Sequence, residues 1–99
     1  MSNVVWFISF QLVEGANEEE FLMASKRVHD EVLSKQKGFV SWNILRDGDT
    51  WVDLVTWESE EAAKNGEKAG NENPIAHEFY SFLNCETITA KNYSIEKTY

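Results

Sequence analysis

The sequence has a single cysteine, few basic residues and no long apolar run. Because Cys85 is alone, no intrachain disulfide can form and no thiol pair could hold a zinc ion. The formal charge of -8, from 17 acidic and 9 basic side chains, would repel phosphate backbones and anionic lipid, so no nucleic-acid partner is expected. No apolar run approaches the roughly 20 residues of a membrane span, and the N-terminus lacks a basic leader. These absences predict a soluble, unprocessed, cytoplasmic protein without membrane contact.

Repeats, linkers and low-complexity segments are absent as well, so residues 1–99 are expected to form a single domain. An apolar content of 42% suits one core. The predicted elements follow in order: a strand over 4–13, a helix capped by Asn17, a hairpin over 38–58, a short polar helix from Ser59 that loosens at Asn65-Gly66, a helix from Pro74 to Asn84, and a strand over 86–96.

The hairpin over 38–58 organises the chain, because it holds three of the four tryptophans and the clearest turn signal. Asp47-Gly48 is typical of a two-residue turn, and β-branched and aromatic residues flank it. This turn predicts a register with Arg46 opposite Asp49, Ile44 opposite Trp51, Trp42 opposite Asp53, and Val40 opposite Val55. Ser41, Asn43, Val52 and Leu54 then take the other face.

Two strand-helix-strand units that share a central hairpin predict an α+β, ferredoxin-like βαββαβ fold. Its four-stranded antiparallel sheet carries both helices on one face. Large apolar residues occupy both phases of the strands, as Trp6 and Phe7 do. One sheet face would therefore be apolar and bare, so we expect a homodimer through sheet-to-sheet packing. In the last strand the apolar phase changes after Ala90, which predicts either a bulge near Lys91-Asn92 or an end that reaches the partner.

Several segments together resemble a known family. They are GFVSWNILRDGD, the entry Lys37-Gly38-Phe39 into its strand, the passage WVDLVTWESEEAA, and Pro74-Ile75-Ala76-His77. Over nearly the whole chain they resemble the dimeric α+β barrel domains of the antibiotic biosynthesis monooxygenase type. The resemblance implies a cavity between each subunit's sheet and helices. It also implies a function among cofactor-free monooxygenases of phenolic polyketides or quinols, haem-degrading enzymes, or relatives without a known substrate.

The haem-degrading alternative is the weakest of these. His77 falls close to the histidine of that branch, but Gly66 stands near the place of its tryptophan, and Ile8 or Ser9 replaces its asparagine. We therefore expect no cofactor. The acidic runs at Glu18–Glu20 and Glu58–Glu61 are helix starts and not metal sites.

Asp53 and His77 are the candidate catalytic residues. A carboxylate in mid-strand must face water, a partner group or a cavity, and a histidine at a pocket rim could serve as an acid or base; a solvated position is the alternative for each. Candidate residues of a pocket for a small aromatic molecule are Trp42, Trp51, Trp57, Tyr80 and Asn43. The sequence leaves two functions open: a cofactor-independent monooxygenase acting on a phenol or quinol, and a non-catalytic, dimeric ligand-binding or stress-associated module.

Overall fold

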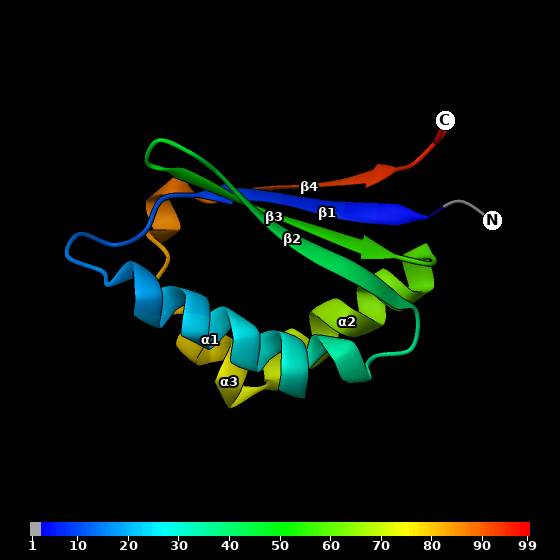
Figure 1. Ribbon diagram of the computed structural model, residues 1–99. Coiled ribbons are helices and arrows are strands. Elements are labelled where there is room, and N and C mark those ends of the chain that lie inside the picture. The colour runs from blue at the N-terminus through cyan, green and yellow to red at the C-terminus, as the bar shows by residue number, and fades with distance from the viewer. Residues whose placement is uncertain (1–2) are drawn as a thin grey trace.

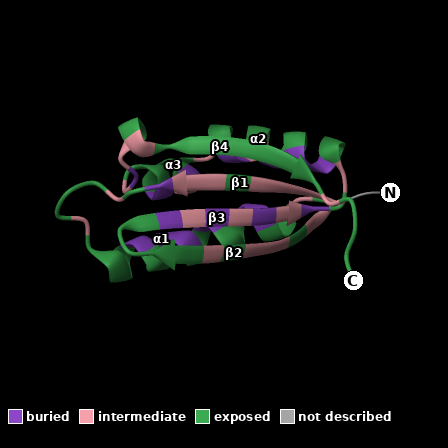
Figure 2. Ribbon diagram, turned by 90° about the horizontal axis from the view of Figure 1, so that it is seen from above, coloured by how far each residue is buried: buried purple, intermediate pink, exposed green. Residues whose placement is uncertain are grey.

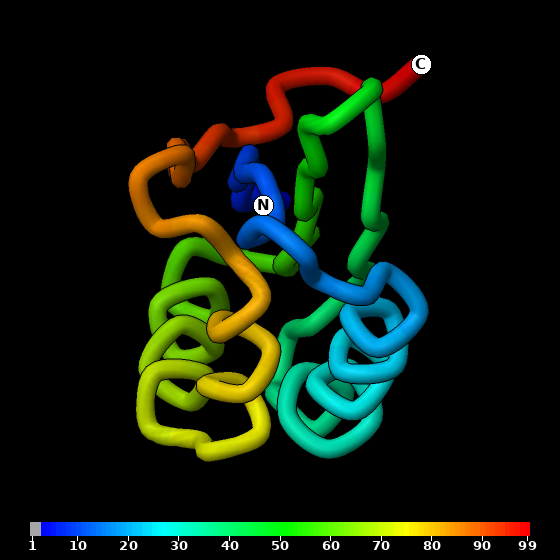
Figure 3. The backbone as a smooth tube through the Cα atoms, turned by 90° about the vertical axis from the view of Figure 1, so that its left-hand side faces the viewer, coloured from blue at the N-terminus to red at the C-terminus, as the bar shows by residue number. Residues whose placement is uncertain are grey.

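Within residues 3–99, which the computed structural model describes, four strands form one antiparallel sheet in the order β2-β3-β1-β4. The helices cover one of its two faces, so the molecule has a helical layer and a sheet layer (Figures 1 and 3). The elements are β1 (Val4–Phe10), α1 (Glu18–Glu31), β2 (Phe39–Asp47), β3 (Thr50–Trp57), α2 (Glu60–Glu72), α3 (Pro74–Tyr80) and β4 (Thr89–Ser94). The predicted ferredoxin-like α+β fold is confirmed.

Each helix begins after a residue whose side-chain oxygen accepts a hydrogen bond from the first turn. The distances from side-chain oxygen to backbone nitrogen are 3.0 Å at Asn17, 3.1 Å at Ser59 and 2.8 Å at Asn73. These contacts satisfy backbone donors that have no partner within the helix. Pro74 follows Asn73 at the first position of α3, where a missing amide costs nothing.

The hairpin register differs from the prediction by two residues. Asp47 pairs with Thr50, so the loop residues are Gly48 and Asp49 and not Asp47-Gly48. Gly48 has φ 61°, and no other residue of the loop has positive φ. Gly48 therefore takes the first of the two loop positions, as in a type II′ turn, whereas the prediction placed it second.

This shift changes the partners across the hairpin but keeps the two faces. Ile44 lies opposite Asp53 and Trp42 opposite Val55. Because side chains alternate with period two, a shift by two leaves Trp42 and Asp53 together on the helix-facing side. A register change that the sequence did not predict lies in β2, between Phe39 and Ser41.

β4 is regular, so the predicted bulge near Lys91-Asn92 is wrong. Its pairing with β1 runs without interruption from Ser94 opposite Val4 to Thr89 opposite Ser9. Ala90 and Tyr93 therefore face opposite sides of the sheet. The whole strand is exposed, and it forms one edge of the sheet (Figure 2).

α2 is one continuous helix, although its glycines had predicted a loose end. Gly66 lets the helix approach the sheet, since a Cβ there would lie 2.1 Å from Cη2 of Trp57. Trp57 is fully buried beneath this helix. Gly66 is therefore a packing residue at a close contact between α2 and the Trp57 ring.

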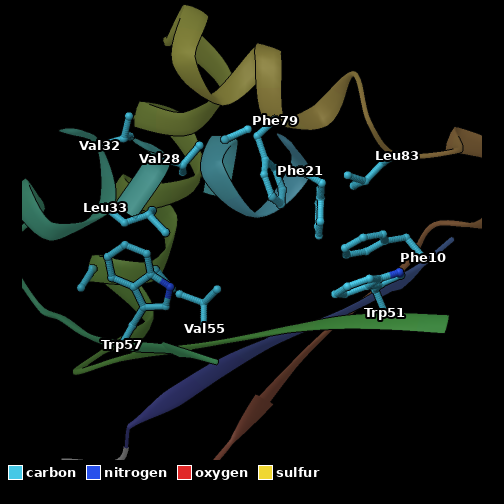
Figure 4. Close-up of a cluster of buried hydrophobic side chains, with 13 residues drawn as sticks. Phe10, Phe21, Val28, Val32, Leu33, Trp51, Val55, Trp57, Phe79 and Leu83 are labelled. Carbon is cyan, nitrogen blue, oxygen red and sulfur yellow. The ribbon is translucent and has the colours of Figure 1, made fainter. Parts of the chain in front are cut away.

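The core lies between the sheet and the helices (Figure 4). At its centre Phe21 of α1 stacks on Phe79 of α3, with ring centroids 5.2 Å apart, and meets Trp51 of β3 edge to face at 5.2 Å. These aromatic contacts fix both helices against β3. None of the helices in residues 3–99 is both long and apolar enough to cross a bilayer.

Candidate functional site

Asp53 is a buried carboxyl group in the middle of β3, between the two layers. Only 5% of its surface is exposed, and its neighbours on the same strand face are Trp51 and Val55. The indole N–H of Trp42 donates to its Oδ1 at 3.2 Å. Burial raises the pKa of Asp53 to about 7, and the Trp42 hydrogen bond opposes this rise. Asp53 can therefore gain or lose a proton near neutral pH.

A small cavity adjoins Asp53 beneath the helices. Its volume is about 40 Å³, and its walls are mainly aromatic and aliphatic. They comprise Trp6, Ile8, Val28, Leu33, Trp42, Val55, Gly66, Gly70, Ala76, Phe79 and Tyr80. Glycines on α2 leave room here, because Gly66 and Gly70 lie one turn apart on the same side of the helix. At about 40 Å³ this inner cavity is by itself smaller than a usual ligand site, which spans roughly 300–1,000 Å³.

A wider chamber of about 260 Å³ adjoins this inner cavity. The two spaces share three wall residues, Trp6, Ile8 and Tyr80, and are therefore adjacent. The other residues of the wider chamber come from α2 and β4: Glu67, Asn71, Ala90, Lys91 and Asn92. The two spaces form one site, with Asp53 at the inner end and polar side chains at the mouth.

Tyr80 stands where the two spaces meet. Burial raises the pKa of its hydroxyl, and the charges of Asp53 and Glu67 raise it further. Tyr80 therefore stays protonated at neutral pH and can donate a hydrogen bond into the cavity. Its hydroxyl also lies beside α2, 3.3 Å from the position that a Cβ on Gly70 would take.

His77 does not line the cavity. It lies exposed on α3, and its Nε2 donates to the backbone oxygen of Asn71 at 2.6 Å. This bond ties α3 to the last turn of α2, which gives His77 a structural contact at the junction of the two helices.

The remaining predicted pocket residues divide between core and surface. Trp51 packs in the core under the guanidinium of Arg46, 4.7 Å from its ring centroid. Trp57 packs against α2 and is not a wall of the cavity. Asn43 pairs with Leu54 on the opposite face of the sheet, so it cannot reach the site. Of the five predicted pocket residues, only Trp42 and Tyr80 lie at the cavity.

The prediction missed Trp6, Glu67, Asn71 and Asn92. Trp6 carries no distinguishing signal in the sequence, since the other residues of its strand phase are also apolar. Glu67 and Asn71 had a detectable signal, because they are one helical turn apart and directly follow Gly66 and Gly70. That repeat places two polar groups beside two positions where the helix can approach the sheet.

His77 is not placed to bind haem iron in this cavity. The haem reading requires His77 as the iron ligand or catalytic histidine, but its Nε2 is bonded to the Asn71 backbone outside the cavity. Gly66, which stands near the position of the haem-degrading branch's tryptophan, is in close contact with the Trp57 ring. Within residues 3–99, no three histidine, cysteine, aspartate or glutamate side chains converge as a metal site would require.

Comparison with known proteins gives a result for the fold. No protein-family model matches the sequence, and no curated protein matches it. A variant of SnoaB, a cofactor-independent oxygenase from Streptomyces nogalater, superposes with TM-score 0.80 at 18% identity, over 99% of this chain and 97% of that one. The chain has the fold of an antibiotic biosynthesis monooxygenase.

Two further structures agree with this fold assignment. A protein from Bacillus cereus, provisionally assigned as an antibiotic biosynthesis monooxygenase, matches with TM-score 0.66 at 17% identity, over 100% of this chain and 98% of that one. A dimeric ferredoxin-like protein from an uncultured marine organism matches with TM-score 0.66 at 12% identity, over 100% and 92%. The resemblance to the monooxygenase fold, predicted from the sequence, is confirmed in the structure.

Proposed function

We propose that the cavity binds a small hydroxylated aromatic molecule and that Asp53 is the base that removes its proton. The observation that carries this proposal is a carboxyl group buried to 5% exposure, with a pKa of about 7, at the inner end of an aromatic-walled cavity. A general base is most effective when its pKa lies near the working pH. Asp53 meets that condition, and His77 lies outside the cavity.

The proposed chemistry keeps the charge of the site constant. The Asp53 carboxylate takes the hydroxyl proton of a hydroquinone, or of an anthrone in its hydroxyl tautomer. The carboxylate becomes neutral and the substrate becomes an anion, so the net charge does not change. Proton removal makes the ring electron-rich enough to reduce oxygen directly. For an anthrone, the CH2 carbon gives up four electrons and two protons to O2. One oxygen atom becomes the new carbonyl, and the other leaves as water.

The walls would supply orientation and exclusion of water. Trp6 and Trp42 offer flat surfaces against which an aromatic ring can stack. The protonated Tyr80 hydroxyl is the donor for the developing oxyanion, while the Trp42 N–H holds the Asp53 carboxylate. The SnoaB variant with the same fold is a cofactor-independent oxygenase, which supports this reaction class.

The experiment is oxygen uptake with a panel of anthrones and hydroquinones. Asp53→Asn keeps the shape of the side chain and removes the base, so we expect kcat to fall about 100-fold or more. His77→Ala should retain activity, since His77 lies outside the cavity. Equal turnover by wild type and Asp53→Asn would overturn the role of Asp53.

The second candidate is a non-catalytic binding module. Its support is that Asp53 is the sole ionisable residue among the described walls of the inner cavity, apart from Tyr80, so no acid-base pair is present there. This candidate predicts saturable binding of the same aromatic compounds without oxygen uptake. Binding and respirometry on one protein preparation separate the two functions.

We also propose that the chain works as a homodimer through the uncovered face of the sheet. That face carries Phe7 and Tyr93, whose rings meet edge to face at 6.3 Å, and the exposed Leu45. A dimeric ferredoxin-like protein shares the fold. Light scattering at micromolar concentration should give twice the chain mass, and Phe7→Asp should give the monomer. A monomeric wild type would refute the dimer without affecting the cavity.

A further inference from the structure

The cavity has a carboxyl group at each end. Asp53 closes the inner end, and Glu67 of α2 lines the mouth. The remaining charged residue of the walls is Lys91 on β4. Lys91 pairs with Phe7, and the strand alternation sends its side chain to the opposite face of the sheet, away from the helices. Within the described walls, the charges directed to the ligand space are negative.

Glu67 forms no ion pair within residues 3–99. Lys64, one turn earlier on α2, lies 3.5 Å from Glu60 instead. Within residues 3–99, no cationic nitrogen lies within 4.0 Å of the Glu67 carboxylate. Glu67 is exposed at the mouth of the cavity, so its charge acts on an entering ligand through partly screened space.

We propose that Glu67 is the specificity-determining residue of this cavity, and that it selects uncharged hydroxyarenes over analogues that carry a carboxylate. This inference rests on the binding part of the proposed function and is independent of oxygen chemistry. The inner groups suit a neutral hydroxyl, since Asp53 accepts a hydrogen bond from it and Tyr80 donates one to it. An added carboxylate would have to sit in the outer chamber beside Glu67.

The size of the effect follows from Coulomb's law. Two like charges about 6 Å apart, at an effective dielectric constant of about 40, change a binding constant about tenfold. Salt reduces the effect at the open mouth, because the Debye length is about 8 Å at physiological ionic strength. Discrimination should therefore be largest at low salt.

The test uses two probes that differ by one carboxylate, 2-naphthol and 6-hydroxy-2-naphthoate, titrated calorimetrically under nitrogen at pH 7 and low salt. The proteins are wild type, Glu67→Gln, and Glu72→Gln as a control for net charge. Glu72 is an exposed residue at the end of the same helix, and it lies outside the walls of the cavity. We expect wild type and Glu72→Gln to bind 2-naphthol about tenfold or more tightly than the naphthoate. Glu67→Gln should bring the two affinities within about threefold by strengthening naphthoate binding.

Each outcome has a clear meaning. If 2-naphthol binds but Glu67→Gln leaves the ratio of affinities unchanged, the specificity role of Glu67 is wrong and the proposed binding function stands. If Glu72→Gln lowers the ratio as much as Glu67→Gln does, net charge and not the position of Glu67 sets the preference, and the inference is again wrong. If neither probe binds to wild type, both the inference and the proposed function fail.

Discussion

Trp42 and Asp53 lie diagonally across the β2–β3 ladder and are joined by an N–H to carboxylate hydrogen bond of 3.2 Å. The bond holds the Asp53 carboxyl against one wall of the cavity. It also favours the ionised form, while burial favours the protonated one. The proton affinity of Asp53 is therefore set by a balance between one indole and the surrounding apolar walls.

Replacing Trp42 with phenylalanine should shift this balance. Trp42→Phe keeps an aromatic wall but removes the donor, so the pKa of Asp53 should rise above its value of about 7. The acid limb of the pH profile of kcat/KM should move to higher pH, and NMR of the Asp53 carboxyl carbon should give the same shift. Trp51→Phe is the control, because Trp51 packs on Phe21 and Arg46. An identical profile in Trp42→Phe and wild type would contradict the assignment of Asp53.

The pH dependence of stability gives a second test that needs no substrate. The pKa of Asp53 is about 7 in the folded protein against an ordinary value of 3.8, so the folded state binds this proton more tightly than the unfolded state. The resulting stability is complete below about pH 4 and is lost as the pH rises through 7. The slope is about 1.4 kcal/mol per pH unit, which sums to about 4 kcal/mol as an upper bound.

Urea unfolding of wild type and Asp53→Asn at pH 5 and pH 8 measures this difference. The asparagine variant cannot ionise, so its stability relative to wild type should increase from pH 5 to pH 8. Contributions of all other titrating groups cancel in the comparison at equal protein concentration. A constant difference between the two proteins would show that Asp53 titrates normally in the folded state.

Gly66→Ala should destabilise the fold even though alanine is the better helix former. The added Cβ would lie 2.1 Å from the Trp57 ring, so either α2 or the indole must move. Overpacking of this kind costs about 1–3 kcal/mol, which exceeds the gain of about 1 kcal/mol in helix propensity. Urea unfolding measures the result, and Lys68→Ala, at an exposed position of α2, is the matched control. Increased stability in Gly66→Ala would show that the contact relaxes freely.

Tyr80→Phe tests whether the hydroxyl at the junction of the two spaces contacts the ligand. Loss of one hydrogen bond to a ligand oxygen costs about 0.5–1.5 kcal/mol, so the affinity for 2-naphthol should fall about threefold to tenfold. Tyr93→Phe, on the uncovered face, should bind as wild type does. If both variants bind equally well, the Tyr80 hydroxyl makes no contact with the bound hydroxyarene.

The fold could be predicted from the sequence because local signals agreed with one another. Asn17 and Ser59 cap the helices that their positions predicted, and Pro74 begins α3 as expected. The alternation in the strands predicted which residues face the helices. This prediction stayed correct although the hairpin register differs by two residues, because a shift of two keeps each side chain on the same face. Turn geometry was less predictable, since Asp47-Gly48 and Gly48-Asp49 are both favourable pairs and differ only in which position glycine takes.

The site was predicted less completely, for a physical reason. Asp53 could be singled out, because a carboxyl in mid-strand is costly unless it has a partner or a cavity. The tryptophans could not be separated by sequence, since Trp51 and Trp57 in the core and Trp42 at the cavity share one strand phase and one residue type. They differ in what packs above them: α2 covers Trp57 and Phe21 of α1 covers Trp51, whereas Trp42 borders the cavity. These contacts depend on how the helices pack on the sheet, which the strand pattern does not specify.

The position of β4 at the sheet edge has a consequence for ligand exchange. Residues of α2 and β4 line the outer chamber, on the helical side of the sheet, whereas the bare apolar surface is on the reverse side. If the proposed dimer forms through that reverse surface, it leaves the outer chamber uncovered, so ligand exchange should be unaffected. Chemical crosslinking of the proposed dimer through that surface should leave the rates of ligand binding and release unchanged.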